Sequence, residues 1–394
     1  LLLWFLCLDL LAVVWFGYRY LERKIPDELF VSEGKEEQVK NVLDFPFLSF
    51  DDAITVSGDG SYLLKARILG VIPFKDVKIT PADSESVMVS GDTVGIYMET
   101  DGVLVIDTGE IVSQEGFTQE PAKNIVKPGD YIVAFNDQTV HSKKELIEDL
   151  SKLDDSQVTL EVIRNGEKIP LSITPVKDVR GEYKLGVWVR DNTQGIGTLT
   201  FVDEKGNFGA LGHGISDVDT GELLHINEGA LYQAKIIGIQ KGSSGSPGEI
   251  SGMIHYDAQQ VIGSIDKNCD QGIFGTLNIV PKPLSLKKME VVYKQELETG
   301  PATVLCGIDG EVKEFDAEIT RIDMNHEDSN KSFVIQVTDQ GLLDMTGGIV
   351  QGMSGSPVIQ NGKFAGAITH VFVQDAAGGY GIFAETMIEN VEKE

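Results

Sequence analysis

The chain has 394 residues, of which 42% are hydrophobic, and this is enough to bury two or three cores of ordinary domain size. Its 61 acidic residues outnumber 33 basic ones and give a net charge of −28, which argues against nucleic acid or an anionic membrane face as the main partner. The three cysteines form no CxxC motif or Cys/His cluster, so we expect neither a metal site nor a cofactor. Cys269 and Cys306 could form one bridge or remain two buried thiols.

The first residues, Leu1 to Tyr18, form an apolar run that is interrupted only by Asp9. Its length is close to the roughly 20 residues that cross a bilayer. A carboxylate near mid-span costs about 2.5–3.5 kcal/mol on insertion scales, which the strongly apolar neighbours can offset. No small-x-small cleavage site follows the run, so we expect residues 1–20 to be a transmembrane signal-anchor, with a cleaved signal peptide as the alternative.

Polar, mixed sequence with short strand-like stretches follows the apolar run. Residues 62–68 and 71–74 are examples of these stretches. We interpret residues 21–85 as a linker and a small β-rich segment that connects the anchor to the body of the protein.

Residues 86–177 have the organisation of a separate module. An apolar-Gly-apolar turn at Val94, Gly95 and Ile96 leads into strand-like sequence, and a Lys-Pro-Gly-Asp turn follows at residues 127–130. Ser142 and Glu145 predict the capped start of a helix that runs to about Lys152. Two strands joined by an Asn-Gly turn then predict a hairpin over residues 158–176.

This order of elements resembles a PDZ domain over the whole module. PDZ domains bind extended chains or free C-termini by strand addition. The resemblance implies that Val94, Gly95 and Ile96 supply the backbone N–H groups at the entrance of the peptide groove. The alternative is a β-module that acts only as a spacer.

Residues 185–394 are rich in strands and glycine and contain an approximate internal repeat. Gly-Ser-Ser-Gly-Ser-Pro begins at Gly242, and Gly-Met-Ser-Gly-Ser-Pro begins at Gly352. In both copies an apolar strand follows and ends near a histidine, His255 or His370. A duplicated β-barrel explains the repeat, and two facing barrels are the architecture of chymotrypsin-like proteases. The predicted fold is therefore mainly β, with an N-terminal transmembrane helix, a PDZ domain and a double-barrel protease domain.

A serine between glycines has the environment of a nucleophile, because glycine permits a tight turn and frees backbone N–H groups to bind an oxyanion. Two-barrel serine proteases carry the nucleophile in the second barrel, which selects Ser354 and leaves Ser244 as a structural turn. The motif at Gly352 also resembles the GDSGGP motif of the chymotrypsin class. By that resemblance the N–H groups of Gly352 and Ser354 form the oxyanion hole.

His213, within the glycine-flanked sequence Ala-Leu-Gly-His-Gly, is the best candidate among six histidines for the general base. The plain alternative is a histidine hydrogen-bonded within a turn. His255 and His370 end apolar strands, which favours a structural role or a place in the wall of a substrate pocket. His141 lies in the PDZ-like module, and His326 lies in a polar stretch.

A third residue has to hold the tautomer of His213 and balance the imidazolium charge. The sequence leaves this residue open between five aspartates: Asp217, Asp219, Asp257, Asp339 and Asp344.

Together, the order of these parts resembles the stage IV sporulation protein B family, PDZ-containing serine peptidases of endospore formers. The resemblance covers nearly the whole chain and is carried by Leu-Gly-His-Gly-Ile at residues 211–215, by the segment around Ser244 and by residues 347–357. It implies that His213 is the base and that Ser354 is the nucleophile. It also implies that Asp339 is the catalytic aspartate, because Asp339 matches the family's aspartate in its distance along the chain from the serine. Asp339 departs from the wider chymotrypsin class, where this aspartate belongs to the first barrel.

The family resemblance also implies a biological role. Such proteins act in the intermembrane space of the forespore, where they cleave themselves and then a regulatory membrane protein of the pro-sigma-K processing complex. The alternatives are a PDZ-containing adaptor with an inactive barrel pair, and an envelope quality-control protease. The presence of both His213 and Ser354 argues against the adaptor. In quality-control proteases the protease domain precedes the PDZ domain, which is the reverse of the predicted order.

Overall fold

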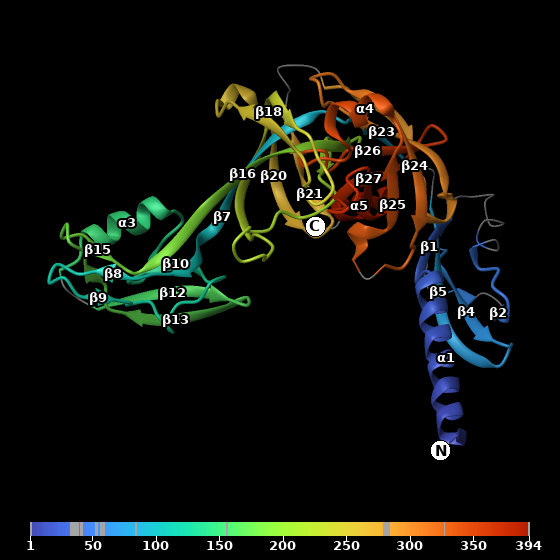
Figure 1. The fold of residues 1–394 in the computed structure, drawn as a ribbon, viewed down its shortest axis with the longest axis horizontal. Coiled ribbons are helices and arrows are strands. Elements are labelled where there is room, and N and C mark those ends of the chain that lie inside the picture. Colours follow the sequence, from blue (N-terminus) through green and yellow to red (C-terminus); the bar gives the residue numbers. More distant parts are fainter. Residues whose placement is uncertain are drawn as a thin grey trace.

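The computed structural model describes residues 2–31, 39, 42–51, 54–55, 60–82, 85–154, 157–278, 284–326 and 328–392. Strands dominate it, as the sequence predicts. An N-terminal helix and a small sheet lie at one end, two barrels lie in the middle, and the PDZ module lies at the other end (Figure 1).

Helix α1 (Leu2–Lys24) covers the apolar run and extends beyond it. Its length and composition would allow residues Trp4–Glu22 to cross a membrane, and none of that stretch is buried against the rest of the protein. In Figure 1 the helix projects away from the body with the N-terminus at its far end. Its last turn has an ion pair between Arg19 and Glu22.

A small sheet follows α1 and packs on its own apolar core. The core includes Ile25, Leu29, Val77 and Ile79. The strand order is β1-β5-β4-β2, and β3 pairs with β4. The strands are β1 (Glu28–Val31), β2 (Leu48–Phe50), β3 (Ile54–Thr55), β4 (Tyr62–Ile68) and β5 (Ile72–Pro81).

The first barrel is a ring of six strands in the order β7-β18-β20-β21-β17-β16, which the β7–β16 pairing closes. The strands are β7 (Thr93–Thr108), β16 (Val187–Val202), β17 (Asn207–Ala210), β18 (Ile226–Gln240), β20 (Val261–Cys269) and β21 (Gly272–Leu277). Outside the PDZ module, three further strands extend this sheet: β6 (Ser86–Val89), β19 (Glu249–Ile254) and β22 (Lys287–Glu290). Helix η1 (Ala258–Gln260) precedes β20.

The PDZ module is inserted into the first barrel between β7 and β16. These two strands run without interruption from the module into the barrel, as Figure 1 shows. Strand β7 contributes to both cores: Val94, Ile96 and Met98 belong to the barrel core, whereas Val103 and Val105 belong to the core of the module. The sequence did not reveal this insertion because one continuous strand serves both cores.

Within the module the predicted helix and hairpin are confirmed. Helix α3 (Lys143–Ser151) starts after Ser142, whose side chain accepts a hydrogen bond from the Glu145 N–H. Asn165 and Gly166 both adopt positive φ in the turn between β12 and β13. The strands of the module are β8 (Ile111–Val112), β9 (Thr118–Gln119), β10 (Tyr131–Phe135), β11 (Gln138–Thr139), β12 (Val158–Arg164), β13 (Glu167–Ile173), β14 (Val176–Lys177) and β15 (Tyr183–Lys184).

The second barrel is closed and has the strand order β23-β24-β25-β28-β27-β26. If the six strands of each barrel are numbered along the chain, neighbouring strands around both rings follow the same order. The strands are β23 (Gly300–Cys306), β24 (Lys313–Ile322), β25 (Phe333–Val337), β26 (Pro357–Gln360), β27 (Lys363–Val371) and β28 (Gly378–Phe383). The remaining helices are α4 (Gln340–Thr346), α5 (Ala384–Glu392), η2 (Lys294–Glu296) and η3 (Ser329–Lys331). The predicted double-barrel architecture is confirmed.

The repeated serine motifs do not occupy equivalent places in the two barrels. Ser244 lies in the turn between β18 and β19, whereas Ser354 lies in the turn that precedes β26. His255 follows β19, whereas His370 lies within β27. The barrels share their strand order, but the motif similarity does not mark the positions that correspond.

Candidate active site

Ser354 lies in a tight turn where the two barrels meet. Its backbone oxygen accepts a hydrogen bond from the Thr198 N–H of β16 at 3.1 Å, and the Thr198 hydroxyl donates to the oxygen of Gly352 at 2.9 Å. Gly355 has φ of +91°, and a Cβ there would lie 2.5 Å from the backbone nitrogen of Leu211. The turn therefore requires glycine, and it packs directly against the segment that leads to His213.

Two backbone N–H groups of this turn have no acceptor among the described residues. They belong to Gly352 and Ser354, whereas the N–H groups of Met353, Gly355 and Ser356 all donate to backbone oxygens. Free, adjacent N–H groups beside a nucleophile are what an oxyanion hole requires.

His213 lies on the first-barrel side, just after β17. Leu211 and Gly212 both have φ near +70°, an uncommon conformation for leucine that often accompanies functional sites. The Nδ1 atom of His213 lies 2.7 Å from the oxygen of Gly214, so the ring donates from Nδ1 and leaves Nε2 as the acceptor. Burial lowers the pKa of His213, an effect that the Gly214 oxygen partly offsets.

Thr369 and His370 of β27 bring the serine and histidine segments together. The Ser354 hydroxyl donates to the backbone oxygen of Thr369 at 3.0 Å. The ring centroids of His213 and His370 are 5.1 Å apart. His370 is thus a neighbour of the candidate base.

His370 is held in its neutral form. Burial, and then the nearby His213 and Lys331, lower its pKa to about 4, and Asp328 opposes this in part. Its Nδ1 atom is buried and has no hydrogen-bond partner among the described residues. Burial therefore favours the neutral form of both imidazoles, whose planes are tilted by 37° to each other.

Asp339 is not brought to His213. It is the N-cap of α4, and its carboxylate accepts a 2.8 Å hydrogen bond from the Leu342 N–H. Within the described part of the chain, the only hydrogen bond of His213 is the one to Gly214. The expected Asp339–His213 contact is therefore missing from this structure, because the first turn of α4 uses the carboxylate.

The other candidate aspartates also have partners of their own. Asp217 and Asp219 both pair with Arg190, with a distance of 2.9 Å between Asp219 and the guanidinium. Asp257 caps η1, and Asp344 accepts a hydrogen bond from Gln340 at 2.8 Å. None of them contacts His213 in the residues that the structure describes.

The predicted peptide-groove residues are wrong. Val94, Gly95 and Ile96 lie inside β7, where Gly95 is paired with Ile196 of β16 on one side and with Tyr232 of β18 on the other. Both edges of the strand are occupied, so no peptide can add there. A Cβ on Gly95 would lie 2.6 Å from Ile254, so this glycine is needed for barrel packing.

A groove of the expected kind lies elsewhere, between α3 and the first residues of β16. Leu185, Gly186 and Val187 repeat the apolar-Gly-apolar pattern, and the N–H groups of Leu185 and Gly186 have no described acceptor. A cavity of about 450 Å³ follows, with Leu146, Ile147, Leu150 and Val189 among its walls. Lys143 and Lys184 also line it. This turn was not predicted as part of the PDZ module, because residues 185–187 stand at the start of the predicted protease domain (residues 185–394).

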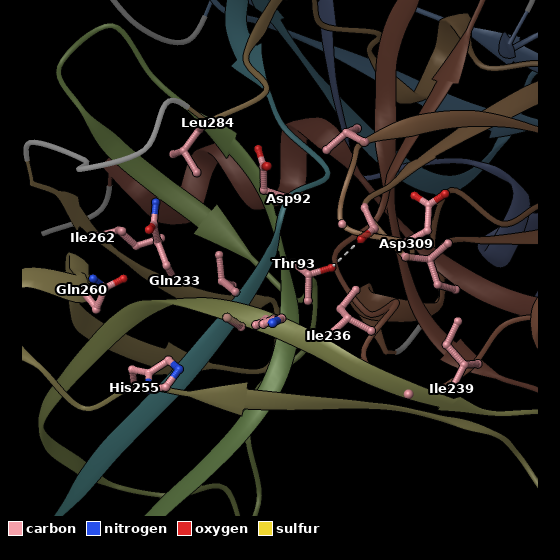
Figure 2. Close-up of a pocket in the computed structure, with 18 residues that line it drawn as sticks. Asp92, Thr93, Gln233, Ile236, Ile239, His255, Gln260, Ile262, Leu284 and Asp309 are labelled. Carbon is pink, nitrogen blue, oxygen red and sulfur yellow. Dashed lines mark hydrogen bonds between the residues drawn. The ribbon is translucent and has the colours of Figure 1, made fainter.

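A larger cavity of about 700 Å³ lies beside β18 and the loop Gly307–Gly310. Figure 2 shows His255 and Gln260 on one side of it and Asp309 on the other, with the Thr93 hydroxyl bonded to the Gly307 oxygen. Neither His213 nor Ser354 lines this cavity. His255 is therefore separate from the candidate catalytic residues.

The three cysteines are free thiols. Cys306 is fully buried, and burial raises its pKa to about 11, so it is not a nucleophile at neutral pH. No group of three or more His, Cys, Asp or Glu side chains that could hold a metal ion occurs in the described ranges.

Several solved structures are similar to parts of the chain. The active form of the Rv3671c protease from M. tuberculosis is 16% identical with a TM-score of 0.28, and the match covers 51% of this chain and 76% of that one. The inactive form of the same protease is 16% identical with a TM-score of 0.26, and the match covers 50% of this chain and 85% of that one. The PDZ domain of the SdrC-like protein (Lmo2051) from Listeria monocytogenes is 19% identical with a TM-score of 0.19, covering 23% of this chain and 87% of that one.

Family models match both main parts of the chain. A PDZ domain model matches residues 79–174. The model described as SpoIVB peptidase S55 matches residues 181–388, which is more than half of the 394 residues and includes both His213 and Ser354. The chain therefore belongs to the SpoIVB peptidase S55 family and is a PDZ-containing serine endopeptidase.

Proposed function

We propose that Ser354 is the nucleophile of this peptidase, that His213 is its general base, and that the N–H groups of Gly352 and Ser354 form the oxyanion hole. The observation that carries this proposal is the convergence of the two segments on β27. Ser354 is bonded to Thr369, and His213 packs on the next residue, His370.

In the proposed reaction the Ser354 hydroxyl leaves the Thr369 oxygen and turns toward His213. Because Nδ1 of His213 donates to Gly214, Nε2 is the atom that can take the proton. The Ser354 oxygen then attacks the scissile carbonyl, and its oxyanion binds to the two free N–H groups. His213 returns the proton to the leaving amine, and water hydrolyses the acyl-enzyme by the same route.

The orienting group for His213 in this arrangement is the Gly214 oxygen, which fixes the tautomer without supplying a charge. Burial already favours the neutral ring, so the base is ready at neutral pH. The proposed role of Asp339 is structural. Its carboxylate caps the start of α4, the helix that leads to Gly347 and the turn of Ser354.

We further propose that the chain is membrane-anchored by α1 and acts in the intermembrane space of the forespore. There it would cleave itself and then a regulatory subunit of the membrane pro-sigma-K processing complex. Family membership and the exposed apolar helix support this role.

The groove between α3 and β16 is the proposed site for a substrate C-terminus or an extended segment of the chain itself. At Val187–Arg190, strand β16 pairs with β7 on one side and has no described strand partner on the other, which is the geometry for strand addition. Lys143 would attract a carboxylate to the turn at Gly186, whereas Lys184 is paired with Glu182 at 2.7 Å and Glu110 also lines the groove.

Labelling of the full chain in detergent micelles with a fluorophosphonate tests the proposed mechanism. Mass spectrometry of the labelled protein should find the adduct on Ser354, and incubation without the label should yield self-cleaved fragments. An adduct on another serine, or self-cleavage that persists in Ser354→Ala, would contradict the assignment.

A further inference from the structure

The first serine motif, which the proposed catalytic mechanism does not use, lies at the end of the β18–β19 hairpin. We propose that this hairpin tip (residues 240–250) of the first barrel is a positioning device for the oxyanion turn (residues 347–354) of the second barrel. The inference rests on the proposed function, because it concerns the same N–H groups of Gly352 and Ser354.

The hairpin tip forms backbone hydrogen bonds with the oxyanion turn and its approach. The Gly242 N–H donates to the oxygen of Thr346 at 2.7 Å. The Ile250 N–H donates to the oxygen of Gln351 at 2.8 Å, and the Gln351 N–H donates back to the oxygen of Gly248 at 2.8 Å. Gln351 immediately precedes Gly352, so its bonds to the first barrel set the direction in which the turn starts.

The same tip is tied to a second segment of the second barrel, just after β27. The Gly245 N–H donates to the oxygen of Val373 at 2.7 Å, and the Ser244 hydroxyl donates to the oxygen of Gln374 at 2.9 Å. Ser244 thus acts as a docking group.

Side-chain packing adds to the backbone contacts. Ile250 is 2% exposed and belongs to the core of the second barrel, although β19 is part of the first-barrel sheet. A Cβ on Gly352 would lie 3.0 Å from the Cβ of Ile250. The isoleucine therefore lies directly against the residue that supplies one oxyanion N–H.

The hairpin tip and the oxyanion turn lie so close together that no side chain fits between them at Gly347. A Cβ on Gly347 would lie 2.3 Å from the oxygen of Gly242, so neither segment can move toward the other. Since catalytic geometry is sensitive to shifts of about 1 Å, a displaced tip would misdirect the N–H groups even with Ser354 and His213 intact.

The experiment compares two large-to-small substitutions on the same strand. Ile250→Ala keeps the Cβ but removes the Cδ1 and Cγ1 atoms that also pack against Gly352, whereas Met253→Ala removes a side chain that is 46% exposed. The readout is the burst of nitrophenolate when the full-length protein in micelles reacts with p-nitrophenyl acetate. The dependence on ester concentration separates the maximal acylation rate from the half-saturation concentration.

We expect Ile250→Ala to lower the maximal acylation rate by about 10- to 100-fold, because a lost oxyanion donor costs about 10²–10³ and a displaced donor costs less. The half-saturation concentration should stay within about twofold, as should both constants of Met253→Ala. If Ile250→Ala does not fold, Ile250→Val should show a smaller fall of the same kind.

An unchanged maximal rate in a folded Ile250 variant, or an equal fall in Met253→Ala, would overturn the inference. A wild-type protein that gives no burst, or a burst that survives Ser354→Ala, would instead overturn the proposed function. The two failures are therefore distinguishable.

Discussion

The hydroxyl of Ser354 donates a hydrogen bond to the backbone oxygen of Thr369 at 3.0 Å rather than to His213. The hydroxyl of the proposed nucleophile is therefore bonded to the second barrel in the free protein. A substrate backbone N–H that binds the Thr369 oxygen would release the hydroxyl toward His213. Catalytic hydrogen bonds are often long or absent before substrate binds, so this arrangement is compatible with the proposed mechanism.

The two serine motifs should differ sharply in their effect on catalysis. Ser354→Ala should abolish self-cleavage, since removal of a nucleophile costs factors of about 10⁴–10⁶ in rate. Ser244→Ala loses only its bond to Gln374 and should keep the self-cleavage rate within about threefold. Gel analysis of full-length protein over time measures both, with circular dichroism to confirm folding. An inactive Ser244→Ala and an active Ser354→Ala would reverse the assignment.

The acid limb of the activity profile should lie below pH 6.5. Burial lowers the pKa of His213, so the neutral ring that acts as base persists as the pH falls below the ordinary value for histidine. The measurement is kcat/KM against pH with a peptide substrate. An acid limb centred above pH 6.5 would show that a negative group lies near His213 in the working enzyme.

His370 should make the stability of the protein depend on pH between about 6.5 and 4. Its pKa is lowered to about 4, so the unfolded chain binds a proton more readily, and stability is complete above 6.5 and falls as the pH drops. The difference between the pKa of His370 in the unfolded chain and in the folded protein corresponds to about 3 kcal/mol of stability. Because the ring is partly exposed to solvent, we expect about half of this value. Urea unfolding should show this slope in the wild type and a flatter one in His370→Gln. Equal slopes would contradict the prediction.

Substitutions at Asp339 distinguish a helix cap from an orienting carboxylate. Asn is also a good N-cap, so Asp339→Asn should keep stability and most activity, whereas Asp339→Ala should cost about 0.5–2 kcal/mol of stability. An orienting aspartate would instead lose about 10⁴ in kcat when changed to Asn. Chemical unfolding and kcat for both variants measure the two effects. A 10⁴-fold loss in Asp339→Asn would show that the carboxylate reaches His213 during catalysis.

The groove of the PDZ module should be needed for protein substrates and not for small reagents. Ile147→Asp places a charge in the apolar wall of the groove and should weaken binding of an extended segment. Val179→Asp is the matched control, because Val179 is 66% exposed and lies outside the groove. The measurement compares self-cleavage with fluorophosphonate labelling of Ser354. A normal self-cleavage rate in Ile147→Asp would make the module a spacer.

Local patterns in the sequence were sufficient to predict several elements of the fold. The Ser142 cap, the Asn165–Gly166 turn and the glycines around Ser354 act over a few residues, so they predict a helix start, a hairpin and a tight turn without knowledge of distant contacts. The family resemblance at residues 347–357 rests on the same local information.

Tertiary structure decided which of several similar patterns performs which task. Val94–Ile96 and Leu185–Val187 are both apolar-Gly-apolar, yet the first is paired on both sides and the second opens onto a groove. Likewise Ser244 and Ser354 share a motif, and only the pairing of distant strands brings Ser354 to Thr369 of β27, next to the residue whose ring lies 5.1 Å from that of His213. A residue's neighbours across a barrel are set by long-range strand pairing. For this reason the composition of a turn could be predicted from the sequence, but not which segment lies against it.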